Sequence, residues 1–430
     1  KTNSRIPVKI GNDSAYAEEP EITVNVNRTK QIEITPKYSF NVFKEEDEED
    51  SDFTFTSINE DIAKVNEKGL VTGVKVGTTW ARVTEKTTGK ENIVIVRVIE
   101  EDSKYASQIS GGDGYATVLK ADGSIWGFGY NSDGQLGNDK LAPINVPSQT
   151  NILATYKQIK AGKKFTVALR EDGTVWAYGD NTYGQLGQGN RVSAKKPVQV
   201  QNLTNIVSIA AGDNHAIAID NLGNVYTWGL NSKGQLGNGT TQTVSIPEKI
   251  TGLDNQMVKI AAGGNLSAII DSTGDVYVFG DNSKEQIEEF KYNYDQYGQK
   301  IMPPLNMYVT QPVKVQTIEN AVKVQCLQTG IVVLKTDESV ERITKYASQT
   351  KAQKETIATG EMVDISGTNE SVVLLDKNGE SYTYGDNSKG QAGIGGTSAN
   401  VTLKKVQMVD AKTYLAIGAG YKNNYIIDTE

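Results

Sequence analysis

The sequence predicts an all-β protein in which a seven-bladed β-propeller is joined to a small β-sandwich. A pattern returns about every 50 residues from residue 105 onward, so that Gly129, Gly179, Gly229 and Gly280 lie 50, 50 and 51 residues apart. The runs between these glycines are short, rich in Val, Ile, Tyr and Trp, and bounded by turn residues, as strands are. Residues 20–100 contain similar short runs without the repeat.

Each repeat is expected to form a four-stranded antiparallel sheet. In the clearest unit the predicted strands are 206–211, 215–220, 224–229 and 246–250. Pairs such as Asp122-Gly123 and Asp172-Gly173 indicate tight hairpins, because Asp and Gly tolerate the backbone angles of two-residue turns. A sheet of this size cannot bury both faces alone. Radial stacking against its neighbours does so, which predicts a propeller.

First strands are expected near residues 106, 156, 206, 257, 321, 362 and 413, which gives seven blades. The fifth, about 321–356, is degenerate because it lacks the Trp, Gly and Asn positions of the repeat. The seventh has two clear strands and needs completion by another segment. Residues 5–10 match the fourth-strand pattern of Lys196-Pro-Val-Gln-Val200. We expect this segment to close the ring within the chain, with strand addition to a neighbouring molecule, giving a filament, as the alternative.

The repeat motif is Gly-x-Asn-x-x-Gly-Gln-Leu-Gly, in three good copies that begin at Gly129, Gly179 and Gly229. It resembles the repeats of the regulator of chromosome condensation family, which forms seven-bladed propellers, and the resemblance covers about 105–430. Members of that family include a nucleotide-exchange factor for a small nuclear GTPase, secreted bacterial β-lactamase inhibitors and many bacterial surface proteins. The resemblance therefore implies a fold and leaves the activity open.

About seven short strands within residues 20–100 predict a small sandwich, expected to project from the propeller rim. The run from Thr56 to Thr79, with Ala63-Lys-Val-Asn66 and Gly69-Leu-Val-Thr-Gly-Val74, resembles a group 2 bacterial Ig-like domain. This resemblance implies an extracellular bacterial protein. The predicted division is therefore 1–19 as a closing strand and linker, 20–100 as the sandwich and 105–430 as the propeller.

Composition excludes several classes of function. The net charge of −8 argues against a nucleic-acid surface, and no apolar run is long enough for a membrane helix. With one cysteine, Cys326, and one histidine, His215, neither a disulfide within the chain nor a Cys/His metal cluster is expected. We expect no catalytic residue, no metal and no cofactor, and hence no enzyme. The chain starts at Lys1 rather than Met, which indicates a processed or trimmed product.

Two features have a functional and a structural interpretation. His215 aligns with Tyr115, Phe165, Leu266, Glu370 and Asn423, a variety that favours packing over catalysis. The acidic run 45–50 offers oxygen ligands for calcium, but it lacks the residue order of a calcium loop, so a solvated loop is favoured.

The candidate binding residues fall in two groups. Loops after the first and third strands of the blades are expected on one face, and they carry Tyr130, Lys163, Lys164, Tyr183, Asp213 and Tyr421. An insertion at 284–310 carries Tyr292, Tyr294 and Tyr297, and it is either a contact surface or a loop folded over the rim. These observations favour a non-enzymatic extracellular protein-interaction module, an adhesin or a building block of a surface assembly. The alternative is a secreted regulator or inhibitor of another protein.

Overall fold

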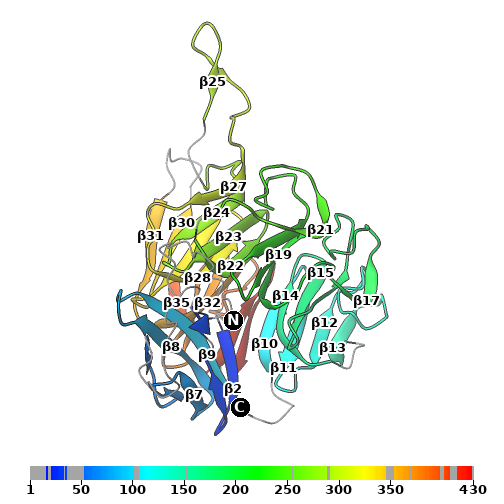
Figure 1. Ribbon diagram of the computed structural model, residues 1–430. Coiled ribbons are helices and arrows are strands. Elements are labelled where there is room, and N and C mark those ends of the chain that lie inside the picture. Colours follow the sequence, from blue (N-terminus) through cyan, green and yellow to red (C-terminus); the bar gives the residue numbers. More distant parts are fainter. Residues whose placement is uncertain are drawn as a thin grey trace, which may run out of the picture.

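A computed structural model describes residues 16–17, 21–32, 34–35, 53–100, 106–150, 154–253, 255–287, 291–344, 353–368, 370–397, 401–406 and 414–428. All regular elements in these segments are strands, so the predicted all-β class is confirmed. The strands form a propeller with a sandwich packed against it and one hairpin projecting from it (Figure 1). Residues 5–10 and the acidic run 45–50 lie outside the described residues.

Six blades are complete antiparallel four-stranded sheets, and the seventh has two strands in the described residues. The first three blades are β10 (Ala106–Gly111), β11 (Tyr115–Lys120), β12 (Ile125–Gly129), β13 (Ile144–Gln149); β14 (Tyr156–Ala161), β15 (Phe165–Arg170), β16 (Val175–Gly179), β17 (Ala194–Gln199); and β18 (Ile206–Ala211), β19 (His215–Asp220), β20 (Val225–Gly229), β21 (Val244–Lys249).

The remaining blades follow the same order around the ring. They are β22 (Met257–Gly263), β23 (Leu266–Asp271), β24 (Val276–Asp281), β27 (Tyr308–Lys314); β28 (Ala321–Leu327), β29 (Gly330–Lys335), β30 (Ser339–Thr344), β31 (Gln353–Thr359); β32 (Met362–Thr368), β33 (Ser371–Asp376), β34 (Ser381–Gly385), β35 (Val401–Lys405); and β36 (Tyr414–Ala419), β37 (Asn424–Asp428). The fifth blade has lost the motif and keeps all four strands, because the motif builds the loop after the third strand rather than the strands themselves.

A buried asparagine organises that loop in five blades. Asn231, with no exposed surface, accepts a hydrogen bond from the Leu236 amide (3.0 Å) and donates one to the Thr240 carbonyl (3.0 Å). Leu236 is thereby held as an apolar plug in the core. Gly229 precedes the loop at φ 100°, where a Cβ would lie 2.5 Å from the Asn214 carbonyl oxygen, so only glycine fits there.

The sandwich consists of two sheets with a shared core. One has the order β2 (Glu21–Asn25), β9 (Glu91–Ile99), β8 (Gly77–Glu85), β5 (Phe53–Ser57), and the other the order β3 (Thr29–Gln31), β7 (Leu70–Gly73), β6 (Ala63–Val65). A short pair, β1 (Tyr16–Ala17) with β4 (Ile34–Thr35), completes the described strands of this region. Val94, Val96 and Val98 of β9 face the core between the two sheets.

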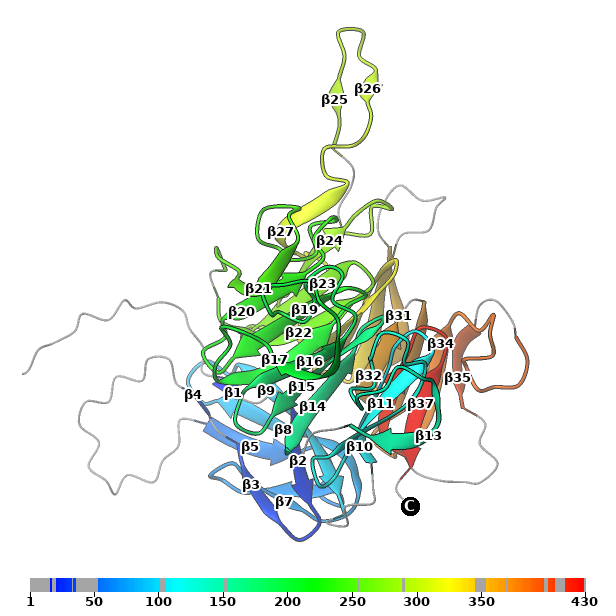
Figure 2. The ribbon, with the colours of Figure 1, turned by 90° about the vertical axis from the view of Figure 1, so that its right-hand side faces the viewer.

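The sandwich covers one face of the propeller rather than projecting from its rim, which corrects the expectation from sequence (Figure 2). Trp80 of β8 is fully buried against the fifth and sixth blades, and its Nε1 donates to the Val363 carbonyl (2.7 Å). Thr78 donates to the Leu415 carbonyl of the seventh blade (2.6 Å). Lys259 of the fourth blade donates to the Ile93 carbonyl (2.9 Å). The large sheet is therefore buried on both faces, so it has no free face to project into solvent.

Candidate functional site

The propeller has two unlike faces, and the candidate residues lie on the open one. The starts of the first strands and the turns after the second strands face the sandwich, as the contacts of Leu415, Val363 and Lys259 show. The loops after the first and third strands lie at the opposite ends of the blades. The open face therefore carries both predicted groups, because the 284–310 insertion is itself the loop after the third strand of the fourth blade.

The loops after the first strands of the first four blades are linked in an arc at the mouth of the central channel. The Asp113 amide donates to the Lys163 carbonyl (3.0 Å), the Lys163 amide to the Asp213 carbonyl (3.0 Å), and the Asp213 amide to the Gly264 carbonyl (2.9 Å). The Lys163 ammonium lies 5.9 Å from the centre of the Tyr421 ring. The structure thus brings Lys163, Asp213 and Tyr421 together from three blades, and these residues form the mouth cluster.

Charge at the mouth alternates and responds to pH. Lys422 lies 3.5 Å from Asp113, and Lys164 lies 3.3 Å from Asp133. Burial raises the pKa of Asp213 to about 6, with a further rise from Asp113 and an opposing effect from Lys163. Asp213 therefore loses its negative charge as the pH falls through about 6, which makes the mouth more positive.

Tyr130 and Tyr183 lie farther out on the same loops. Tyr130 is 62% exposed, and its ring lies over Gly114, next to Asp113. Tyr183 is held by its amide, which donates to Gln185 (2.8 Å), and the following Gly184 packs on Ser245 of the next blade. Tyr183 is therefore separate from the mouth cluster.

The insertion forms a hairpin that projects from the body on the side opposite the sandwich (Figures 1 and 2). It contains β25 (Asn293–Tyr294) and β26 (Lys300–Ile301). Its neck is fixed by Asn282, whose amide side chain donates to the Asn306 carbonyl (3.0 Å). It is not folded over the rim.

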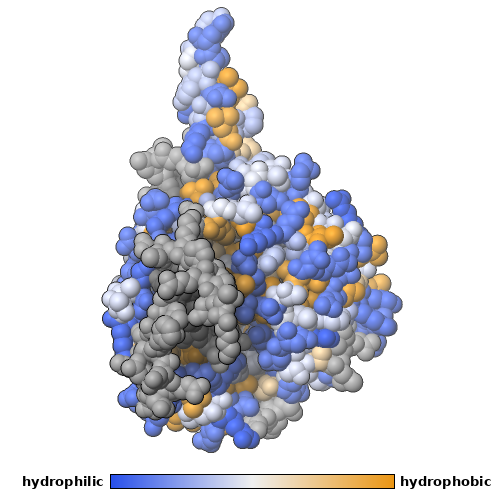
Figure 3. All heavy atoms as spheres, viewed as in Figure 1, coloured by the Kyte–Doolittle hydropathy of each residue, from blue (hydrophilic) through white to orange (hydrophobic). Residues whose placement is uncertain are grey.

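The hairpin exposes aromatic and aliphatic side chains, which are common at protein interfaces. Tyr297 is 80% exposed and Tyr294 58%, and the nearby Met302 is 67% exposed. Figure 3 shows apolar side chains gathered on the lower part of an otherwise hydrophilic hairpin. The Tyr292 ring lies under the Lys300 ammonium at 4.3 Å, which stiffens the base of the hairpin.

His215 is a core residue, as the sequence suggested. It is fully buried, its Nε2 lies 2.9 Å from the Ser267 hydroxyl, and burial lowers its pKa to about 4. Ser267 donates its own proton to the Gln235 carbonyl (2.8 Å), so His215 donates through Nε2. The strand register pairs His215 with Gly229 and Ser371 with Gly385, so the equivalent residue in the sixth blade is Ser371 rather than Glu370. In the seventh blade it is Asn423, as expected, because Tyr414 pairs with Asp428 as Ile206 pairs with Asp220, and the Gly420 amide donates to the Asn423 carbonyl as Gly212 does to His215.

Sequence reasoning missed a buried charge cluster under the sandwich. Arg97 of β9 pairs with Glu21 (2.6 Å) and Asp364 (2.7 Å), and Lys323 pairs with the same two carboxylates (3.1 and 2.7 Å). The cluster joins strands more than 300 residues apart, so no local pattern could show it. Among the described residues no group of three or more His, Cys, Asp or Glu side chains is placed to hold a metal. No described helix is long and apolar enough to span a bilayer.

Comparison with known proteins agrees with this architecture. A model of the RCC1-like domain matches residues 73–343, more than half of the chain, and a model of the group 2 bacterial Ig-like domain matches residues 23–96. No curated protein sequence matches.

Two solved structures resemble the chain in fold. Human WBSCR16 has a TM-score of 0.63 at 21% identity, over 78% of this chain and 88% of that one. Yeast RCC1 (Prp20), solved with Kap60 bound to it, has a TM-score of 0.64 at 17% identity, over 77% and 81%. Identities this low carry the fold alone. With the family match over more than half of its residues, the chain belongs to the RCC1-like domain family and combines that propeller with a group 2 bacterial Ig-like domain.

Proposed function

We propose that this protein is a non-enzymatic extracellular protein-interaction module, a bacterial cell-surface adhesin or a building block of a surface assembly. In this proposal residues 20–100 are the Ig-like domain and 105–430 the propeller. The observation that carries it is the asymmetry of the propeller. One face is covered by the sandwich, while the opposite face displays the mouth cluster and the tyrosine-bearing hairpin.

The chemistry of the open face supports protein binding. Tyrosine offers rigid, amphipathic contact area at low entropic cost, and the hairpin holds it clear of the body. Lys163, Asp213 and Tyr421 supply charged and aromatic contacts beside an arc of hydrogen-bonded loops. Tyr130, Lys164 and Tyr183 extend this surface outward.

A secreted regulator or inhibitor is the second candidate, and the hairpin favours it. A narrow two-stranded projection with exposed Tyr297 and Met302 suits insertion into a concave site on another protein.

Antibody labelling of intact producing cells, with the culture medium assayed in parallel, separates the two candidates. Retention on the cell surface supports the adhesin or assembly role, and protein found only in the medium supports the regulator. Protein found only inside the cells contradicts both.

The face itself is tested with purified variants. We expect Tyr294→Ser/Tyr297→Ser to reduce binding to intact cells several-fold. Leu222→Ser, which removes an exposed apolar side chain from a turn after a second strand, is the matched control. Equal binding by both variants would refute the assignment of the hairpin.

A further inference from the structure

The central channel is lined by two rings of residues from the first strands. Strand register makes Gln108, Gln158, Ser208, Lys259, Lys323, Asp364 and Ala416 equivalent, because each follows the irregularity at the start of its first strand. Lys160 belongs to the next position inward in the second blade. The sandwich closes one end of this channel with Arg97 and Glu21, and the cavity of about 120 Å³ runs from there along the first strands as far as Gly111 and Ala211.

Positive charge exceeds negative charge at this closed end. Arg97, Lys160, Lys259 and Lys323 line the cavity with Glu21, and Asp364 lies behind them in contact with Arg97 and Lys323. Four cations therefore face two carboxylates, within a chain whose net charge is −8. The two carboxylates are both engaged by Arg97 and Lys323.

Two donors at this end lack a protein acceptor. Among the described residues the Lys160 ammonium has no hydrogen-bond or ion-pair partner. The Nε of Arg97, a residue only 5% exposed, is buried and likewise without an acceptor in the described part of the chain. The Arg97 Nε is a buried donor, and Lys160 is half-buried on the cavity wall. A buried donor beside an excess of positive charge is costly unless it is paired, so this site calls for a negatively charged acceptor.

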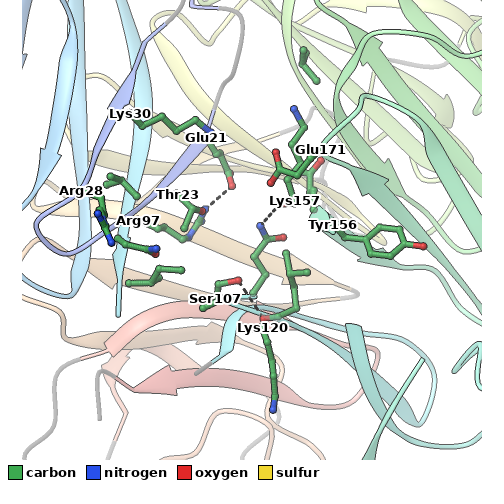
Figure 4. Close-up of a pocket in the computed structure, with 18 of the residues that line it drawn as sticks. Glu21, Thr23, Arg28, Lys30, Arg97, Ser107, Lys120, Tyr156, Lys157 and Glu171 are labelled. Carbon is green, nitrogen blue, oxygen red and sulfur yellow. Dashed lines mark hydrogen bonds and ion pairs between the residues drawn. The ribbon is translucent and has the colours of Figure 1, made fainter. Parts of the chain in front are cut away.

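A side cleft gives access to the cavity. This cleft of about 340 Å³ lies between β2 and the first two blades, and it shares Glu21, Arg97, Gln108 and Gln158 with the channel. Figure 4 shows Lys30 and Arg28 on the sandwich side, Lys157 and Glu171 across the cleft, and Lys120 at its edge. Its charged lining is mostly basic, which attracts anions toward the channel.

We propose that the closed end of the propeller channel binds a small tetrahedral oxyanion, of the phosphate or sulfate type, between Lys160, Lys259 and Arg97. The cavity is many times larger than the ~10–15 Å³ that one water needs, so an ion of this size fits. The ligand bridges sandwich and propeller, because Arg97 comes from β9 and the lysines come from β14 and β22.

The acid–base behaviour of the lysines supports the site. Burial lowers the pKa of Lys160 to about 8, with Lys323 and Arg97 acting in the same direction and Glu21 and Asp364 opposing it. Burial also lowers the pKa of Lys259 to about 7, where Lys323 adds to the effect and Glu21 opposes it. A bound anion raises both pKa values, so binding takes up protons.

The experiment is calorimetric titration of the full chain with phosphate and sulfate, at a pH between the two lysine pKa values, in buffers of different ionisation heat. We expect saturable binding of both anions, with net proton uptake measured on sulfate, which does not itself titrate at this pH. Lys160→Gln should weaken it about tenfold or more, since a charge-assisted hydrogen bond is lost. Lys160→Arg should retain it, and Lys404→Gln, an exposed lysine on β35, should leave it unchanged.

Three results would overturn the proposal. The first is the absence of binding heat with both anions, and the second is unchanged affinity in Lys160→Gln. The third is acetate binding more tightly than phosphate, which would assign the site to a carboxylate. If Lys160→Gln does not fold, proton uptake by the wild-type chain on binding sulfate decides, because adsorption of sulfate at exposed lysines of ordinary pKa takes up no protons at this pH.

Discussion

In the first three blades, the first residue of the second strand is matched to the blade that follows it. The Tyr115 hydroxyl lies 3.4 Å from the Thr166 hydroxyl, and His215 bonds Ser267. Phe165 belongs to the same buried cluster as Ala216, which occupies the position of Thr166 and Ser267 in the third blade. A polar ring thus meets a hydroxyl in the next blade, and an apolar ring meets a methyl group. This pairing explains why the position accepts residues of such different chemistry.

Replacing His215 with Phe should therefore cost little at neutral pH. One hydrogen bond is lost, at about 1 kcal/mol, while Ser267 keeps its bond to Gln235. Ser267→Ala should cost more, about 2 kcal/mol, because it leaves both His215 Nε2 and the Gln235 carbonyl unpaired. Denaturant unfolding measures both. A larger loss for His215→Phe than for Ser267→Ala would contradict this account.

At acid pH the order of stability should reverse, so that His215→Phe has a higher free energy of unfolding than the wild type. The folded pKa of His215, about 4, lies below its unfolded value, so the unfolded chain takes up the proton first. The neutral imidazole's contribution is complete above about pH 6.5 and is lost as the pH falls toward 4, by about 3 kcal/mol. The difference in unfolding free energy between the two proteins, followed from neutral pH to pH 4, isolates this effect. A difference that does not change with pH would refute it.

At the scale of elements, the loop after the third strand depends on its asparagine. Asn231→Ala should lower the free energy of unfolding by about 2–3 kcal/mol, because it strips buried bonds from the Leu236 amide and the Thr240 carbonyl. Asn378→Ala, at an exposed turn position, is the control and should change it by less than about 0.5 kcal/mol. Thermal and denaturant unfolding test both variants. Equal effects would show that the side-chain hydrogen bonds of Asn231 do not stabilise the loop.

Repeat register made most of the strands predictable. The six predicted starts from 106 to 362 coincide with those of β10, β14, β18, β22, β28 and β32, and the seventh differs by one residue. Where the motif fades, alignment slipped by one, as at Glu370. In the fourth blade Lys284-Glu-Gln-Ile287 departs from the motif, yet the Ile287 amide still donates to Asn282 (2.8 Å). The loop therefore keeps this hydrogen bond without the glycines of the motif.

The docking of the sandwich could not be predicted from local patterns, because it joins residues far apart in the chain. A clue was present in Asn92-Ile-Val-Ile-Val-Arg-Val98, whose uninterrupted apolar run is typical of a strand buried on both faces. The channel lysines had a similar clue, since Lys259 and Lys323 stand where the first three blades carry Gln or Ser. For the open face, sequence placed the candidate loops together, but only the fold shows that Tyr183 lies apart from Lys163.

At the scale of the molecule, Trp80 should couple the unfolding of the two parts. Trp80→Ala removes a fully buried side chain and its bond to Val363, at a cost of about 3–5 kcal/mol. Calorimetry should then resolve two transitions where the wild type shows one, while Thr84→Ala on the same strand leaves a single transition. A single transition in Trp80→Ala would mean that the parts are held together elsewhere.

Closure of the ring remains a prediction about residues 5–10. Deletion of residues 1–11 should give a monomer with a lower melting temperature if this segment completes the seventh blade within its own chain. Assemblies that dissolve into stable monomers would instead indicate strand addition between molecules. No change in either property, by calorimetry and light scattering, would show that the segment is not a propeller strand.

The face covered by the sandwich also carries the first and last described strands of the chain. The described chain enters through β1 and β2 on the sandwich side, and β37 ends at Asp428, paired with Tyr414 beside the covered face. The first and last described strands therefore lie on the same side of the molecule. Attachment at Tyr16 or at Asp428 would turn the hairpin and the channel mouth away from the point of attachment, so that the attached molecule presents them outward.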